Sequence, residues 1–126
     1  MPLLVSHLVF QMSTLPDLDR LKWQSRVLVV FAPGEDDARL KRENELVEAQ
    51  QDGFLERDLK VYRILGDAPD AERLRAKLEV EKKPFAVVLV GKDGSVKLRK
   101  SEPLHPDELF RVIDRMPMRK REMHNQ

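Results

Sequence analysis

The chain has 126 residues, of which 41% are hydrophobic and 36% are charged, and its 23 basic and 22 acidic residues leave a net charge of +1. This length favours a single domain, residues 1–126, that can bury a core without disulfide or metal staples. The balanced charge argues against nucleic acid as a partner, because neutralising phosphates requires a clustered basic excess. The sequence has no cysteine, which excludes disulfides, thiolate catalysis and metals held by cysteine.

Residues 1–14 are expected to form an extra segment ahead of the domain. Apolar residues gather between Leu3 and Phe10, but no basic residue precedes them and no cleavage motif of small residues follows. The segment is therefore a poor signal peptide, and it is too short to cross a bilayer. A short extra strand, or a non-native start ahead of Met12, are the other interpretations. The sequence assigns no compartment, and we expect no membrane partner.

The first third of the chain predicts a turn, a strand and a helix. Residues 15–23 suit a short helix or turn, with Trp23 covering an edge of the core. The unbroken apolar run Val27–Phe31 is typical of a strand buried on both faces. A helix is expected over about 37–51, because acidic residues favour its start and Gly53 is placed to end it.

The next elements are a second strand, expected at Leu59–Leu65, and a helix that starts near Pro69. Apolar residues recur there at helical spacing, which defines the buried face of this helix; they are Ala71, Leu74 and Leu78.

A hairpin and a last helix complete the pattern. The apolar strand Phe85–Val90 and the alternating strand Ser95–Lys100 flank Asp93-Gly94, which is a strong hairpin turn. The charged residues of the returning strand suit the edge of a sheet. A helix is expected from Pro106 to the break at Pro117, and residues 118–126 are expected to be a polar, basic tail.

This order of elements predicts the topology. A strand–helix–strand unit forms parallel strands through a right-handed crossover, and the hairpin adds antiparallel strands. The expected fold is therefore α/β: a four-stranded mixed sheet of order 2-1-3-4 with helices on both faces, which is the thioredoxin-like core.

Short stretches in the same order along the chain carry a resemblance to one family. They are Trp23–Arg26, Phe31–Pro33, Arg57–Leu59, Gly91–Arg99 and Ile113–Met123. With them the chain resembles the cysteine-free, peroxiredoxin-like domains sometimes called P-DUDES, which include bacterial single-domain proteins and modules of secreted animal matrix proteins. The resemblance implies a thioredoxin-like fold and no established activity.

The loop after the first core strand is the first candidate site. In redox-active relatives of this fold, a nucleophilic cysteine lies there, at the N-terminus of a helix. Pro33 is followed here by the carboxylates of Glu35, Asp36 and Asp37. Carboxylates at a helix N-terminus oppose a thiolate or phosphate, so a cationic ligand or basic peptide is the functional interpretation. Simple capping of the helix is the alternative.

Pro84 is the second candidate. The resemblance implies a cis Lys83–Pro84 bond beside this loop, where the neighbouring backbone of such folds can bind extended peptides. The alternative is that Pro84 only shapes the chain ahead of its strand.

Two basic positions complete the candidate residues. Lys97 and Arg99 share one face of a strand and could form an anion site, or they could be the solvated charges of an edge strand. Met118 and Arg119 could form an adaptable docking surface, or they could belong to a helix end followed by a frayed tail.

The leading functional hypothesis is a catalytically inert binding or interaction module with a protein or peptide partner. A non-thiol enzyme using Glu35, Asp37 or Arg99 is one alternative, and a homo-oligomeric, stress-associated structural protein, such as a homodimer, is another. No cofactor or metal is expected, since the three histidines are scattered and the glycines form no phosphate loop.

Overall fold

The computed structural model describes residues 15–125, so the interpretations of residues 1–14 lie outside the described residues. The elements, in chain order, are α2 (Leu18–Leu21), β1 (Arg26–Ala32), α3 (Ala38–Glu48), α4 (Gln51–Glu56), β2 (Leu59–Leu65), α5 (Pro69–Lys77), β3 (Ala86–Val90), β4 (Val96–Lys100), α6 (Pro106–Asp114) and α7 (Pro117–His124). Within the described residues, no helix has both the length and the apolar character needed to cross a membrane.

The four strands form one mixed sheet in the order β2-β1-β3-β4, which confirms the predicted topology. β1 runs parallel to β2, with Arg26 opposite Leu59, and antiparallel to β3. β4 pairs antiparallel with β3 and forms the outer edge. All seven residues of β1 are buried, as expected for a strand covered on both faces.

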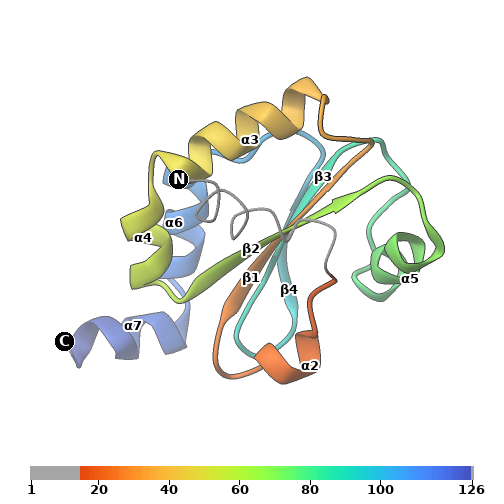
Figure 1. Ribbon diagram of the computed structural model, residues 1–126. Coiled ribbons are helices and arrows are strands. Elements are labelled where there is room, and N and C mark those ends of the chain that lie inside the picture. The colour runs from red at the N-terminus through yellow and green to blue at the C-terminus, as the bar shows by residue number, and fades with distance from the viewer. Residues whose placement is uncertain (1–14, 126) are drawn as a thin grey trace, which may run out of the picture.

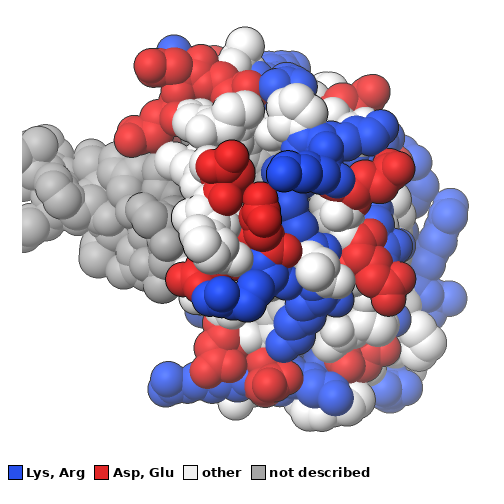
Figure 2. Space-filling model, turned by 90° about the vertical axis from the view of Figure 1, so that its right-hand side faces the viewer, with Lys and Arg blue, Asp and Glu red and all other residues white. Residues whose placement is uncertain are grey.

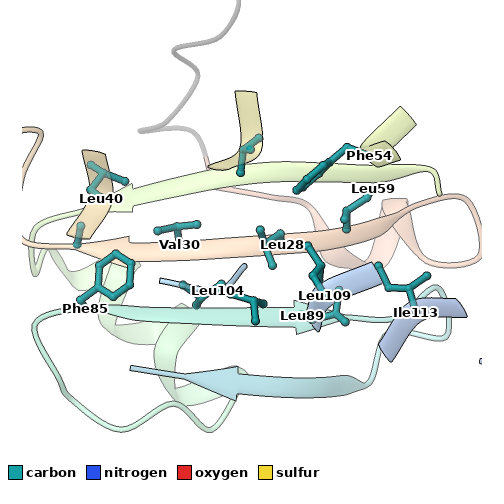
Figure 3. Close-up of a cluster of buried hydrophobic side chains, with 13 residues drawn as sticks. Leu28, Val30, Leu40, Phe54, Leu59, Phe85, Leu89, Leu104, Leu109 and Ile113 are labelled. Carbon is teal, nitrogen blue, oxygen red and sulfur yellow. The ribbon is translucent and has the colours of Figure 1, made fainter. Parts of the chain in front are cut away.

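Helices cover both faces of the sheet (Figure 1). Leu28, Val30 and Ala32 of β1 point to the face that packs against α3, α4 and α6. Figure 3 shows this cluster, in which the aromatic rings of Phe54 and Phe85 lie towards its two ends. The alternate β1 residues, Val27, Val29 and Phe31, belong to the second cluster with α2 and α5, because successive side chains of a strand point to opposite faces.

Gly53 does not end the first long helix, contrary to the expectation. α3 ends at Glu48, and Gly53 lies inside the separate helix α4. A Cβ on Gly53 would lie 2.5 Å from Cε2 of Phe110, so the glycine allows the aromatic ring of α6 to approach the α4 backbone. Packing across the core, rather than helix termination, accounts for this glycine.

The prediction of a polar, basic tail over residues 118–126 is wrong as well. Residues Pro117–His124 form helix α7, whose first residue is a proline at the position where a helix tolerates it. Arg119 is only 1% exposed, so one of the supposed tail residues is among the most buried side chains of the protein. Ion pairs to distant elements, described below, hold the helix in place.

Two local expectations also fail. Trp23 is 60% exposed and does not cover the core, because its backbone turns at a positive φ of 71° and donates its N–H to the Lys92 carbonyl at 2.6 Å. The Lys83–Pro84 bond is trans, since the described chain contains no cis peptide bond. Pro84 follows the exposed residues Lys82 and Lys83 and leads the chain into β3.

Candidate functional site

A groove lies at the end of the sheet where α3 begins. Its volume is about 430 Å³, and it is bounded by the loop after β1, the loop after β2 with the start of α5, and the segment before β3. The lining residues are Ala32, Pro33, Gly66, Asp67, Glu72, Arg75, Lys82, Lys83 and Pro84. This volume is within the range of ligand-binding pockets.

The parallel pairing of β1 and β2 builds this groove. Both strands end at the same edge of the sheet, and Gly66 donates its N–H to the Ala32 carbonyl at 2.9 Å. Gly66 has a φ of +80°, a backbone conformation that glycine adopts without steric cost. The chain can therefore turn sharply after β2, and the groove opens beside this turn.

Arg75 supplies a partly buried cation in the groove. Its guanidinium carbon lies 4.5 Å from the centroid of the Phe31 ring, and its Nη1 donates to the Glu81 carbonyl at 3.0 Å. Burial lowers the pKa of Arg75, and the charge of Glu72 partly offsets this. Among the described residues, no carboxylate oxygen lies within 4.0 Å of the guanidinium.

Lysines and carboxylates accompany Arg75. Lys82 pairs with Glu72 at 3.4 Å, and Lys83 lies 3.8 Å from Glu81. On the surface around α5, Lys and Arg side chains are interspersed with Asp and Glu side chains (Figure 2). The groove therefore has mixed charge.

The acidic loop next to the groove acts mainly as a helix cap. Asp37 accepts hydrogen bonds from the backbone N–H groups of Arg39 and Leu40 at 2.9 and 3.3 Å. The Arg39 side chain is its ion-pair partner at 2.7 Å, and that hydrogen bond holds the pKa of Asp37 below its ordinary value. Glu35 and Asp36 are exposed and do not line the groove.

At the opposite end of the sheet, a charge cluster binds α7 to the start of β1. It has four cations and four anions: Arg26, Arg57, Lys92 and Arg119 with Glu56, Asp58, Asp114 and Glu122. Almost all of its members lie in the stretches that carry the family resemblance. That shared placement was the available sequence signal, and these residues were otherwise missed as a group.

Two carboxylates connect most of the charge cluster. Glu122 accepts from both Nη atoms of Arg26 at 3.2 Å and from Lys92 at 2.7 Å. Asp114 accepts from Arg57 at 2.9 and 3.0 Å and from Arg119 at 3.0 Å. Burial opposes ionisation of both carboxyls, but the hydrogen bonds from the cations outweigh it and hold both pKa values below the ordinary range. The network is charge-balanced, which indicates a structural role: it holds α7 against the start of β1.

The two basic residues of β4 have separate hydrogen-bond partners, and the anion site expected of them stays a prediction. Lys97 pairs with Asp93 at 3.0 Å, whereas Arg99 donates from Nε and Nη2 to the Leu78 carbonyl at 3.1 and 3.0 Å. The hydrogen bond from the Ser95 backbone is the main reason that the pKa of Asp93 is lowered to about 2. Each side chain thus has its own local partner, as in an edge strand.

Glu43 is a buried acid that the sequence interpretation missed. It lies on α3 between Leu40 and Val47 and is 1% exposed. Its Oε1 accepts from the Leu104 N–H at 2.7 Å, and its Oε2 has no hydrogen-bond partner among the described residues. Burial raises the pKa of Glu43 to about 7, although the Leu104 N–H and the charge of Arg63 oppose this. An acid at the i+3 position of an apolar helical stripe was the available signal.

The predicted site residues thus lie in separate places. Pro33 and Pro84 line the groove together, while Lys97 and Arg99 lie on β4. Met118 is half-buried in α7, and Arg119 belongs to the charge cluster. Within residues 15–125, no three His, Asp or Glu side chains gather in a way that could hold a metal ion.

Known proteins agree with this fold. The family model described as a domain of unknown function, DUF4174, matches residues 17–122. The reduced 2-Cys peroxiredoxin of Plasmodium vivax is similar with a TM-score of 0.62 and 16% identity, over 82% of this chain and 84% of that one. Thioredoxin peroxidase I of Plasmodium yoelii is similar with a TM-score of 0.60 and 17% identity, over 86% of this chain and 81% of that one. A mutant of peroxiredoxin 6 from Arenicola marina is similar with a TM-score of 0.53 and 18% identity, over 79% of this chain and 64% of that one.

Proposed function

Since this chain belongs to the DUF4174 family of unknown function, we propose a function from its own geometry: it is a binding module with a thioredoxin-like fold and no thiol chemistry. Its ligand is a short segment of a partner protein, bound in the groove between Pro33 and Pro84. The peroxiredoxin-like neighbours support the fold alone, because their sequence identities are below 20%.

The groove itself is the observation that carries this proposal. Its lining combines the apolar rings of two prolines with Arg75 and two lysines, and such a mixture suits a segment with both apolar and charged side chains. Three separate connections of the fold form its walls. A partner can therefore be recognised there without any change in the sheet.

The same geometry gives little support to the enzyme alternative. The chain has no cysteine, so its own residues cannot supply a thiol nucleophile. Asp37 is engaged by Arg39 and two backbone N–H groups, and the Arg99 guanidinium donates to the Leu78 carbonyl. Neither residue is positioned as a free general acid or base in the groove.

A library of randomised synthetic hexapeptides, screened against the immobilised protein, tests the proposal. We expect peptides with micromolar to millimolar affinity. In ¹H–¹⁵N spectra, they should shift the backbone amide signals of Gly66, Asp67 and Lys83 and leave those of Asp58 and Lys92 unchanged. The proposal fails if no peptide binds, or if the shifts map to β4 or α7.

Three finer expectations stay predictions. They are the P-DUDES subtype, a homodimer as the alternative mode of action, and the protein partner itself. Sedimentation of the purified protein would test the homodimer separately, because a monomer that still binds peptides would exclude it as a requirement for binding.

A further inference from the structure

We infer that the groove recognises a carboxylate group of its ligand through the Arg75 guanidinium. This inference rests on the proposed function and specifies its ligand. It differs from the expectation from the sequence, which placed a cationic ligand near the acidic loop.

The guanidinium of Arg75 is fixed in place before any ligand arrives. One face lies against the Phe31 ring, and Nη1 is held by the Glu81 carbonyl. Phe31 itself is fully buried in β1. An arginine with two such anchors loses little side-chain freedom on binding, and its planar donors match the two oxygens of a carboxylate.

Arg75 also retains unused donors. Its Nε and Nη2 make no hydrogen bond among the described residues, and neither atom is fully buried. By contrast, the four arginines Arg26, Arg39, Arg57 and Arg119 each have a carboxylate partner within 3.2 Å. A partly buried arginine that lines a groove without such a partner is suited to an anion supplied by a ligand.

The other charges of the groove restrict where that anion can lie. Glu72 neutralises Lys82, and Asp67 adds a negative charge to the lining. A ligand with several dispersed negative charges would therefore meet repulsion. The start of α3 is a poor competing site, because the Asp37 carboxylate already accepts from the backbone N–H groups of Arg39 and Leu40 and would repel a second anion. A single carboxylate next to Arg75 is the arrangement that satisfies these charges.

A double-mutant cycle with the tightest library peptide tests this inference. The peptide is compared with analogues in which each Asp or Glu is changed to Asn or Gln, and with its C-terminal amide, so that side-chain and terminal carboxylates are distinguished. Arg75→Gln removes the cation. Arg73→Gln is the matched control, because Arg73 lies on the same helix, is largely exposed and does not line the groove.

We expect Arg75→Gln to lower the affinity for the acidic peptide by about tenfold or more, as for loss of a hydrogen bond to a charged group. The affinity for the neutral analogue should stay unchanged. Arg73→Gln should change neither. Equal weakening of both peptides, or of neither, overturns the inference. So does a library that selects only neutral peptides, although the proposed function would then stand.

A second probe tests the inference even if no peptide binds and the proposed function fails. Butyrate, which carries one carboxylate, should shift the ¹⁵N signal of Arg75 Nε at millimolar concentration, whereas the uncharged butyramide should not. Equal shifts with both compounds, or no shift with butyrate, would overturn the assignment of a carboxylate site.

Discussion

The two ends of the sheet use charge in opposite ways. At the end with the charge cluster, eight ionised side chains pair with one another, and Arg26 and Arg119 are buried to 1% exposure. At the groove end, the ion pair Lys82–Glu72 has side chains that are 80% and 50% exposed, and Arg75 has no carboxylate partner among the described residues. At the first end the charged side chains neutralise one another, whereas at the groove end the Arg75 guanidinium can still pair with the carboxylate of a ligand.

This difference separates stability from binding in one small fold. Removing one partner from a buried ion pair leaves an uncompensated charge, whereas an exposed pair contributes little. Substitutions of the buried members of the charge cluster should therefore lower the free energy of unfolding, and substitutions in the groove should leave it nearly unchanged. Three of the four variants below test this contrast, and the fourth concerns Glu43, a buried acid that belongs to neither region. They are given from the largest expected effect to the smallest.

Glu122→Gln should give the largest effect. It removes the carboxylate shared by Arg26 and Lys92, both of which are at least nine-tenths buried. We expect the free energy of unfolding to fall by about 3 kcal/mol, measured by urea denaturation. Glu45→Gln is the control, because its pair with Arg42 is exposed. A loss below about 1 kcal/mol would contradict the structural role of the cluster in holding α7.

Glu43→Gln should alter how stability depends on pH. The pKa of Glu43 is about 7 in the folded protein against an ordinary value of 4.5, so the folded state binds the proton more tightly. Stability should therefore decrease as pH rises from about 4.5 to about 7, by roughly 3 kcal/mol in total. Glutamine resembles the protonated acid, so the variant should lack this decrease.

Urea denaturation at several pH values measures this effect as the difference between wild type and Glu43→Gln. The difference removes the contribution of carboxyls such as Asp114 and Glu122, whose lowered pKa values act in the opposite direction at lower pH. Parallel pH curves for the two proteins would show that Glu43 is ionised in the folded state.

Asp58→Asn should have an intermediate effect. Asp58 pairs with Lys92 at 2.9 Å, but its side chain is 54% exposed, and Lys92 retains Glu122 as a second partner. We expect a loss of about 1 kcal/mol or less. A loss as large as that of Glu122→Gln would mean that the cluster acts as one unit and not through its most buried members.

Lys82→Gln should have the smallest effect on stability, within about 0.5 kcal/mol of wild type, because its pair with Glu72 is exposed. The same variant should change peptide affinity if the groove is the binding site. Unchanged affinity together with unchanged stability would mean that Lys82 has no role in recognition, and the contrast between the two ends would then depend on Arg75 alone.

The sequence predicted the sheet well because each strand has its own local pattern. The unbroken run of β1, the alternation of β4 and the Asp93-Gly94 turn are all visible without knowledge of distant contacts. The failures at Gly53 and α7 have one cause in common. Phe110 is far from Gly53 in sequence, and Arg26 and Glu56 are far from α7; only the folded chain brings them together.

The candidate site was predicted only in part, again because contacts between residues distant in sequence define it. Pro33 and Pro84 were chosen from the pattern of the fold, and the structure places both in the groove. Arg75 was missed because it is one of many charged residues on α5, and its face of the helix is defined only by its contact with Phe31. Position along a helix cannot show which arginine lacks a carboxylate partner.

The outward position of Trp23 has a spectroscopic consequence. Trp23 is the single tryptophan of the sequence, and its indole is already 60% exposed in the folded protein. Its fluorescence should therefore change little when the core dissolves in denaturant, and circular dichroism is the better signal for unfolding curves.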